Sequence, residues 1–149
     1  MQPVVLGDAV RGALALLQPE LRRLAVRPRL DDAGVTVLAD PVALEQILHN
    51  LLSNALQAME AGVQRRLALH IGTEAGRGLL RLRDGGPGLP PEVLDHLFEP
   101  FVSARPGGLG LGLSLCESLT SAMGGALSAQ NVPDGGAEFR LELPLAAAG

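Results

Sequence analysis

Apolar residues recur at helical spacing in three stretches of the chain, which predicts three main helices. We expect them over residues 6–17, 41–59 and 110–123, with Pro19 stopping the first. Asp40-Pro41 is a typical start for the second helix, because the carboxylate can accept free backbone N–H groups and proline is tolerated at the first helical position. The apolar positions of this second helix form one broad face suited to packing on a sheet: Leu44, Ile47, Leu48, Leu51, Leu52, Ala55, Leu56 and Met59.

Shorter apolar runs bounded by turn residues predict strands. The segment Asp31-Asp32-Ala33-Gly34 between the first two runs has turn chemistry, so we expect these two strands to form a hairpin. A short helix is expected over residues 91–97 and a loop over 98–108. The predicted strands cover residues 24–30, 35–39, 67–73, 79–83, 126–130 and 137–145.

These elements indicate an α+β fold, a two-layer sandwich in which a mixed sheet of about five strands is covered on one face by the three main helices. The other face of the sheet would stay in contact with water or meet another domain. We expect residues 1–149 to form a single domain, because a chain of this length can bury one substantial core.

Composition and charge narrow the range of functions. The formal net charge of -4 argues against a nucleic-acid partner, and the local group Arg22, Arg23, Arg27 and Arg29 has no Trp or Tyr beside it to stack on bases. No apolar run reaches the ~20 residues that a membrane helix needs. The single cysteine, Cys116, cannot form an internal disulfide and is expected to be a small core residue.

Two asparagines one helical turn apart, Asn50 and Asn54, lie at one border of the apolar face of the second predicted helix. Amide oxygens are hard ligands suited to Mg²⁺, which keeps waters and substrate phosphates in its coordination shell. Taken alone, the pair fits ordinary surface amides better than a metal site, so its meaning depends on the motifs that follow.

The segment Asp84-Gly85-Gly86-Pro87-Gly88 comes directly after a predicted strand. A carboxylate at the end of a strand can accept a hydrogen bond from the exocyclic amine of adenine, and glycines let the chain turn sharply against a flat ligand. Guanine presents an oxygen at that position and should be rejected. A polar turn without a ligand is the alternative for this segment.

A second glycine cluster, Gly107-Gly108-Leu109-Gly110-Leu111-Gly112, precedes the third predicted helix. Backbone amides at a helix N-terminus attract anions, and glycine lets phosphate oxygens approach the main chain. The spacing does not fit a dinucleotide-binding fold, and no Gly-Lys-Ser/Thr ending of a phosphate loop is present. The cluster therefore favours a nucleotide site of another class.

Together the motifs resemble the catalytic ATP-binding domain of bacterial two-component sensor histidine kinases, a Bergerat ATP-binding fold, and especially kinases with a short lid, such as the nitrogen-regulation and dicarboxylate-sensing types. The resemblance covers almost the whole chain. It rests on four ordered motifs: Asp40-Pro41 through Asn50 and Asn54, Asp84 to Gly88, Phe98-Glu99-Pro100-Phe101, and Gly108 to Ser114.

The resemblance implies that ATP and Mg²⁺ are the cofactors and assigns a role to each motif. Asn54 would be the main Mg²⁺ ligand with Asn50 beside it, Asp84 would bind the adenine amine, and Arg105 would reach the γ-phosphate. Asn50, Asn54 and Arg105 would thus act in catalysis. Further nucleotide contacts are implied for Ala58, Gly86, Gly88, Leu89, Phe98, Phe101, Gly108, Leu109, Gly110, Leu111, Gly112 and Leu113.

In this family Phe98 and Phe101 would anchor a mobile ATP lid over about residues 98–108. The chain departs from the family pattern in its last strand, where Ala137 follows Gly136 and relatives commonly carry Thr or Ser. That difference puts in doubt a water contact to the adenine.

A histidine followed by an acidic residue and a nearby proline, the phosphoacceptor motif of the family, is missing, because His49, His70 and His96 are followed by Asn, Ile and Leu. We therefore expect the acceptor on a dimerisation domain upstream in a parent chain, with residues 1–20 as the junction. The fragment would be monomeric and the parent a homodimer, with a response regulator downstream. The domain itself would lie in the cytoplasm, and the parent could be an inner-membrane sensor.

Two other functions stay open at this point. A serine kinase of the anti-sigma type resembles the same fold and transfers phosphate to a hydroxyl, and a nucleotide sensor without catalysis would use the same pocket. Topoisomerases, mismatch-repair proteins and heat-shock chaperones also look similar, but they place a glutamate near the asparagine to activate water. Here Asn50 stands one turn before Asn54, so efficient hydrolysis is not expected.

Overall fold

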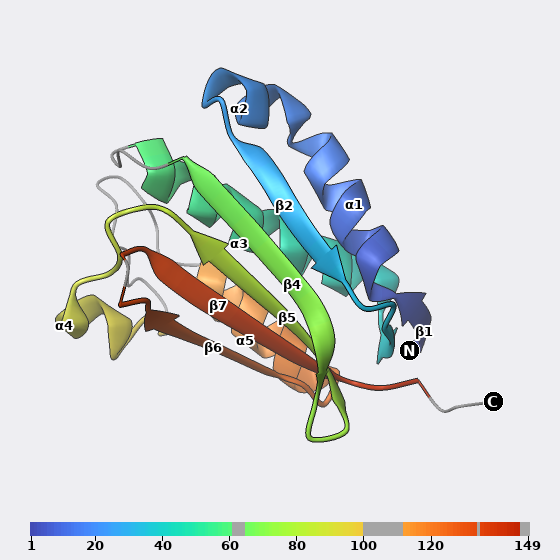
Figure 1. Cartoon of the computed structure of the whole chain (residues 1–149). Helices are drawn as coiled ribbons and strands as arrows, with labels where there is room; N and C mark the ends of the chain where they lie inside the picture. Colours follow the sequence, from blue (N-terminus) through green and yellow to red (C-terminus); the bar gives the residue numbers. More distant parts are fainter. Residues whose placement is uncertain (61–64, 100–111, 134, 147–149) are drawn as a thin grey trace.

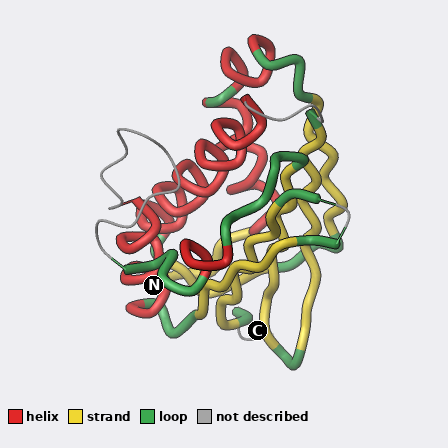
Figure 2. The backbone as a smooth tube through the Cα atoms, turned by 90° about the vertical axis from the view of Figure 1, so that its left-hand side faces the viewer, coloured by secondary structure: helices red, strands yellow, loops and turns green. Residues whose placement is uncertain are grey.

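The chain folds into two layers, one of strands and one of helices (Figures 1 and 2). The computed structural model describes residues 1–60, 65–99, 112–133 and 135–146. Figure 2 shows the helices gathered on one side of the main sheet. The predicted α+β sandwich is therefore confirmed.

The main sheet has five strands in the order β2-β4-β5-β7-β6. Strand β2 pairs with β4 in parallel, and every other pairing in this sheet is antiparallel, so the sheet is mixed as expected. The β4–β5 and β6–β7 pairs join neighbours in sequence and match the predicted strands within a few residues. The bounds are β2 Arg27–Asp32, β4 Arg66–Glu74, β5 Arg77–Asp84, β6 Ala126–Asn131 and β7 Ala137–Pro144.

Three long helices cover one face of this sheet: α1 Leu6–Leu16, α3 Pro41–Glu60 and α5 Gly112–Ala122. Every residue of the predicted apolar face of α3 is buried. It packs above alternate strand residues such as Leu69, Leu82 and Leu141, which are at most 1% exposed. The apolar face of α3 and the apolar side of the strands therefore pack together in one core.

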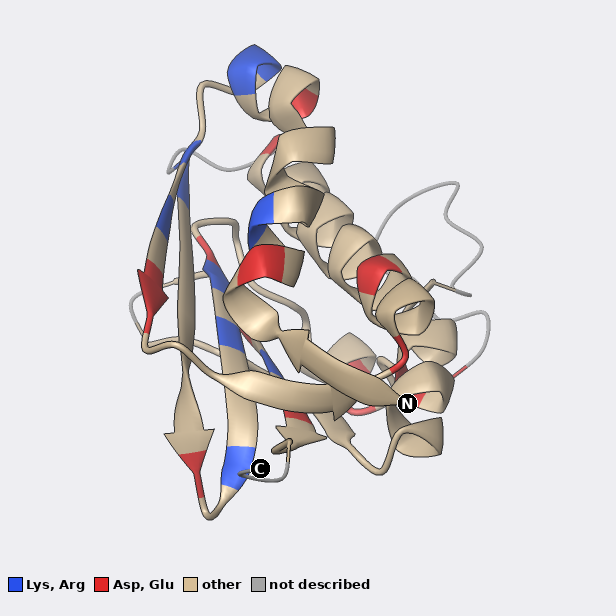
Figure 3. Cartoon of the chain, turned by 90° about the vertical axis from the view of Figure 1, so that its right-hand side faces the viewer, with Lys and Arg blue, Asp and Glu red and all other residues tan. Residues whose placement is uncertain are grey.

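The outer face of the sheet is rich in arginine (Figure 3). Cross-strand partners share a face, and the register aligns His70, Arg81 and Arg140 in one row and Ala68, Arg83 and Glu138 in the next. The exposed ion pairs of Arg140 with Glu74 and Glu142 lie on this face. Charged side chains thus keep this layer in contact with water.

The predicted hairpin between residues 24–30 and 35–39 is wrong. The Asp32 side chain accepts the Gly34 N–H at 2.8 Å, which forms the expected turn. The strand that follows, β3 Thr36–Ala39, leaves the main sheet and pairs antiparallel with β1 Gln2–Val5. Turn chemistry reverses the chain but does not choose the partner of a strand, and the partner here is an N-terminal strand that the pattern did not predict.

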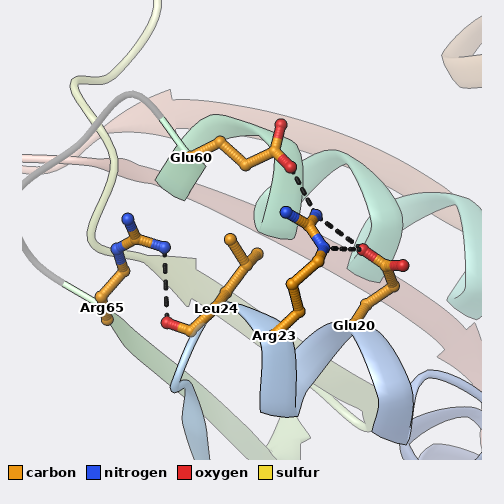
Figure 4. A network of polar contacts seen from close by, with 5 residues as sticks. All are labelled: Glu20, Arg23, Leu24, Glu60 and Arg65. Atoms are coloured by element: carbon orange, nitrogen blue, oxygen red, sulfur yellow. Dashed lines mark hydrogen bonds and ion pairs between the residues drawn. The ribbon is translucent and has the colours of Figure 1, made fainter.

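The segment before β2 also differs from expectation. Pro19 ends α1 as predicted, but it lies in the first turn of a short helix α2, Gln18–Arg23, where its missing N–H costs nothing. The strand therefore starts at Arg27 and not at residue 24. The Arg23 guanidinium bonds Glu20 within α2 and Glu60 at the end of α3, while Arg65 donates to the Leu24 carbonyl oxygen (Figure 4).

Candidate nucleotide-binding site

Helix α3 carries both asparagines, Asn50 and Asn54, and both are half-buried. The helix starts as the sequence predicts, because Asp40 Oδ1 accepts the Val42 N–H at 3.0 Å and the Ala43 N–H at 3.4 Å. The well-defined start and the fully buried apolar face hold the two amides in place along α3.

Cys116 on α5 contacts α3 close to Asn50. The thiol is completely buried, and its Sγ donates a long bond of 3.9 Å to the Ile47 carbonyl oxygen. Burial raises the pKa of the Cys116 thiol, and a side-chain hydrogen bond with Asn50 acts in the opposite direction. Cys116 is therefore the core residue that the sequence predicted, and its contact with Ile47 places the N-terminal half of α5 beside the asparagine helix.

Asp84 ends β5 and is only 4% exposed. Its Oδ1 accepts two backbone hydrogen bonds, from the Gly86 N–H at 2.9 Å and from the Ala137 N–H at 3.3 Å. Burial raises the pKa of the Asp84 carboxyl, and the two backbone bonds partly offset this effect. Both of these bonds go to Oδ1, so they leave the second oxygen, Oδ2, as the atom of this carboxylate that could meet a ligand.

Gly136 makes the contact between Asp84 and the last strand possible. Its φ is +88°, and a Cβ at this position would lie 2.0 Å from the Asp84 carbonyl oxygen. In the sequence, Ala137 in place of the Thr or Ser of relatives put a water contact to the adenine in doubt. The contribution of Ala137 is its backbone N–H, which the identity of its side chain does not reveal.

The glycine segment after Asp84 packs directly on α3. A Cβ on Gly86 would lie 3.0 Å from both the Cβ and the carbonyl oxygen of Ala58. Only a residue without a side chain allows this close approach. Ala58 and Gly86, predicted as nucleotide contacts from distant parts of the sequence, are thus neighbours.

The next residues, Gly88 and Leu89, contact Asn131, a residue that was not predicted from the sequence to belong to the site. Gly88 has a φ of +84°, and Leu89 packs partly buried against the core. Both contact Asn131 at the end of β6. The predicted strand ended at residue 130, so Asn131 fell in the connection to the last predicted strand, and no local signal pointed to Leu89.

The remaining predicted contacts divide into two groups. Phe98 and Leu113 are described and pack partly buried against the core, and Gly112 is the first residue of α5. The other predicted residues, Phe101, Arg105, Gly108, Leu109, Gly110 and Leu111, lie outside the described residues. The short helix α4, Pro91–Leu94, leads from the glycine segment toward Phe98.

Among the described residues, no three His, Cys, Asp or Glu side chains lie close enough to hold a metal ion. The donors near the candidate site are the amide oxygens of Asn50 and Asn54. Such oxygens fit Mg²⁺, which takes few protein ligands and completes its shell with water and phosphate. Within the same part of the chain, no helix is long and apolar enough to cross a membrane.

Comparison with known proteins identifies the family. The model of the histidine kinase-, DNA gyrase B- and HSP90-like ATPases matches residues 39–147. The chain belongs to this family. The match starts just before the Asp40 cap and includes Asn50, Asn54 and Asp84, so the whole site described above lies inside the ATPase domain.

Two curated relatives of the chain are sensor proteins. The chain is 38% identical to the sensor protein FixL of Bradyrhizobium diazoefficiens over 91% of its length, and 40% identical to the C4-dicarboxylate transport sensor protein DctB of Pseudomonas aeruginosa over 94%. It spans about a quarter of each relative, 27% and 24% respectively.

Two solved structures share the fold of the chain. Full-length ShkA in complex with AMPPNP superimposes with a TM-score of 0.85 at 33% identity, covering 99% of this chain and 32% of ShkA. The catalytic domain of histidine kinase ThkA gives a TM-score of 0.84 at 23% identity, covering 97% of this chain and 95% of ThkA. The ATPase fold of this chain is thus similar to that of a histidine kinase catalytic domain over nearly its entire length.

Proposed function

We propose that this chain is the catalytic domain of a sensor histidine kinase, which binds Mg-ATP and presents the γ-phosphate to a histidine on a separate dimerisation domain. The observation that carries the proposal is Asp84. Its Oδ1 is occupied by two backbone amides, so Oδ2 can accept a hydrogen bond from an exocyclic amine. Adenine carries this amine at C6, where guanine carries an oxygen that cannot donate a hydrogen bond.

Asn54 and Asn50 would hold Mg²⁺ through their amide oxygens, with Asn54 as the main ligand. Bound Mg²⁺ would neutralise charge on the phosphates. The contact between Ile47 on α3 and Cys116 on α5 supports this arrangement, because it brings the asparagine helix beside the N-terminal half of α5. The amides of Gly108, Gly110 and Gly112 would meet the phosphates, and Arg105 would contact the γ-phosphate.

The protein's contribution to phosphoryl transfer would be positioning and charge neutralisation, because this reaction needs little covalent chemistry from the enzyme. The chain offers no glutamate one turn before Asn54 that could activate water. We therefore propose transfer to a protein acceptor and not hydrolysis as the productive reaction.

The acceptor histidine would lie in a parent chain upstream of this domain, and residues 1–20 would form the junction. The parent would be a homodimer in the cytoplasm or at the inner membrane, and a response regulator would receive the phosphate from it. The similarity to FixL and DctB over about a quarter of their length supports a multidomain parent.

Calorimetry with Mg-ADP and Mg-GDP tests the nucleotide site. The wild type should bind ADP in preference to GDP, and Asp84→Asn should weaken ADP binding at least about tenfold, because a charge-assisted hydrogen bond contributes ~1.5–3 kcal/mol. In Asp84→Asn, the side-chain oxygen can still accept both backbone N–H groups. The side-chain NH₂ would then face the adenine amine, and two donors cannot form a hydrogen bond. Unchanged ADP affinity in Asp84→Asn would refute the assignment of this residue.

Phosphotransfer tests the reaction class. The chain should phosphorylate a separately supplied cognate dimerisation domain with Mg-ATP, and the product should be labile to acid, as phosphohistidine is. Asn54→Asp should change mainly the Mg²⁺-dependent part of nucleotide affinity. An acid-stable product would instead support a serine kinase of the anti-sigma type.

A further inference from the structure

The side chain of Asn131 forms two hydrogen bonds with a single residue in the glycine segment. The Leu89 N–H donates to Asn131 Oδ1 at 2.8 Å, and Asn131 Nδ2 donates to the Leu89 carbonyl oxygen at 2.7 Å. An adjacent β-strand would satisfy the same two backbone groups. Asn131 therefore holds Leu89 as a strand partner would, although 42 residues separate the two in sequence.

The approach of Asn131 is close, and it depends on glycine at the preceding position. A Cβ on Gly88 would lie 3.0 Å from Asn131 Oδ1, and the φ of +84° at Gly88 is a conformation that favours glycine. The segment from Gly86 to Leu89 is thus fixed at two points, by Ala58 on α3 and by Asn131 on β6.

The turn that starts at Asn131 also holds Asp84. Asn131 and Ala137 are directly opposite each other in the β6–β7 register, and the Val132 N–H donates to the Gly136 carbonyl oxygen at 3.0 Å. At its far end the turn donates the Ala137 N–H to Asp84 Oδ1. The same end of the β6–β7 hairpin therefore contacts Asp84 through its backbone and Leu89 through a side chain.

We propose that Asn131 is a positioning residue that sets the adenine selectivity of the site, an inference that rests on the proposed nucleotide-binding function. It fixes the distance between the carboxylate that reads the base and the Gly88–Leu89 segment that lines the base pocket. The Asn131 side chain is exposed, so it contributes little to the core. Preorganisation of a binding loop improves both affinity and discrimination, because the ligand does not have to order the loop.

Asn131→Ala removes both bonds to Leu89. We expect about tenfold weaker ADP binding and a similar fall in the ratio of ADP to GDP affinity, because the nucleotide would then have to order the Gly88–Leu89 segment itself. For Asn131→Asp, both quantities should lie between those of the wild type and Asn131→Ala, because the carboxylate still accepts the Leu89 N–H but cannot donate to the Leu89 carbonyl oxygen. Gln130→Ala, which changes the exposed neighbour on the same strand, should leave both quantities unchanged.

Calorimetry with Mg-ADP and Mg-GDP on the folded variants separates the outcomes. A wild type that binds neither nucleotide would contradict the proposed function itself. A wild type that binds ADP, with the same ADP-to-GDP ratio in Asn131→Ala, would overturn only the positioning role. A uniform loss of both affinities would also overturn it, because a purely structural contribution does not distinguish the bases.

If Asn131→Ala does not fold, hydrogen exchange of the wild-type chain tests the same inference. The Leu89 amide should be protected in the absence of nucleotide, since its N–H is held by Asn131. Fast exchange of this amide would show that the segment is not preorganised and would overturn the proposal.

Discussion

Asp84 is a buried carboxylate, and within the described part of the chain it forms no ion pair with a cation. The groups that offset its burial are the backbone amides of Gly86 and Ala137, and the net effect is a raised pKa. A neutral amide would fit this environment with less cost in folding free energy. The negative charge is explained by the proposed ligand, because a hydrogen bond to the adenine amine would compensate for part of the burial.

Asp84→Asn is expected to raise the Tm of the nucleotide-free domain at neutral pH. Because the pKa of Asp84 is raised in the folded state, the folded chain binds more protons than the unfolded chain between the ordinary value of ~3.9 and the raised value. Stability of the wild type therefore falls as the pH rises through this window. Thermal unfolding from about pH 4 to pH 8 should show a Tm difference that grows with pH, and a difference independent of pH would contradict the prediction.

Gly136→Ala should be among the most damaging glycine substitutions in the described chain. The new Cβ would meet the Asp84 carbonyl oxygen, and the positive φ would add strain. We expect a loss of about 3 kcal/mol or more in the free energy of unfolding, from overpacking and the left-handed conformation together. Urea denaturation measures this loss.

Gly76→Ala is the matched control for that experiment. Gly76 has a φ of +75° in the β4–β5 turn, and a Cβ there would meet nothing within 4 Å. Its substitution should cost only the conformational strain of about 1–2 kcal/mol. Equal losses for the two variants would mean that the contact with Asp84 adds nothing.

At the scale of elements, α3 is the helix on which the site depends. Its sequence predicted its start, its length and its buried face, because a cap, a proline and a regular apolar period agree. Strands β2 and β3 show the opposite case. Each was predicted approximately as a strand, yet the assumed pairing was wrong, since the choice of partner depends on segments that are distant in sequence.

Asp40→Ala should destabilise the domain by about 1 kcal/mol, because the Val42 and Ala43 N–H groups lose their acceptor. Asp40→Asn should keep most of the stability, since asparagine caps helices as well as aspartate does. Urea denaturation of the three proteins measures this difference. If both variants were equally destabilised, the negative charge and not the hydrogen bond would be the stabilising feature.

At the scale of the whole molecule, one hydrophobic core joins the sheet to α1, α3 and α5. On the outer face of the sheet, ion pairs link side chains of neighbouring strands. Glu138 on this face is only 3% exposed, and its Oε2 accepts a bond of 2.9 Å from Arg83 Nη2. The pair Arg23–Glu60, which links α2 to the end of α3, is exposed on both sides. The two pairs should therefore differ in their effect on stability.

Arg83→Gln should lower the free energy of unfolding by about 1–3 kcal/mol, because it leaves the Glu138 carboxylate buried beside a weaker donor. The half-exposed position of Arg83 keeps this loss below that of a fully buried pair. Arg23→Gln should cost less, and its effect should diminish with added salt. Denaturation at low and high salt distinguishes the two, and a larger loss for Arg23→Gln would contradict this account.

The sequence by itself determined the elements whose signals are local: the buried face of α3, its Asp40 cap and the approximate positions of strands β4, β5, β6 and β7. The sequence also indicated the candidate nucleotide-binding residues, since Asn50, Asn54, Asp84 and the glycines stand in a recognisable order. The roles of these residues stay predictions until nucleotide binding is measured.

Only the tertiary structure decided which groups meet at Asp84. The N–H of Ala137 reaches it across 53 residues, and Asn131 reaches Leu89 across 42. Every residue except proline carries a backbone N–H, so no sequence pattern marks the one that a buried carboxylate will use. Strand pairing brings the end of β5 next to the β6–β7 turn, and this long-range contact completes the candidate site.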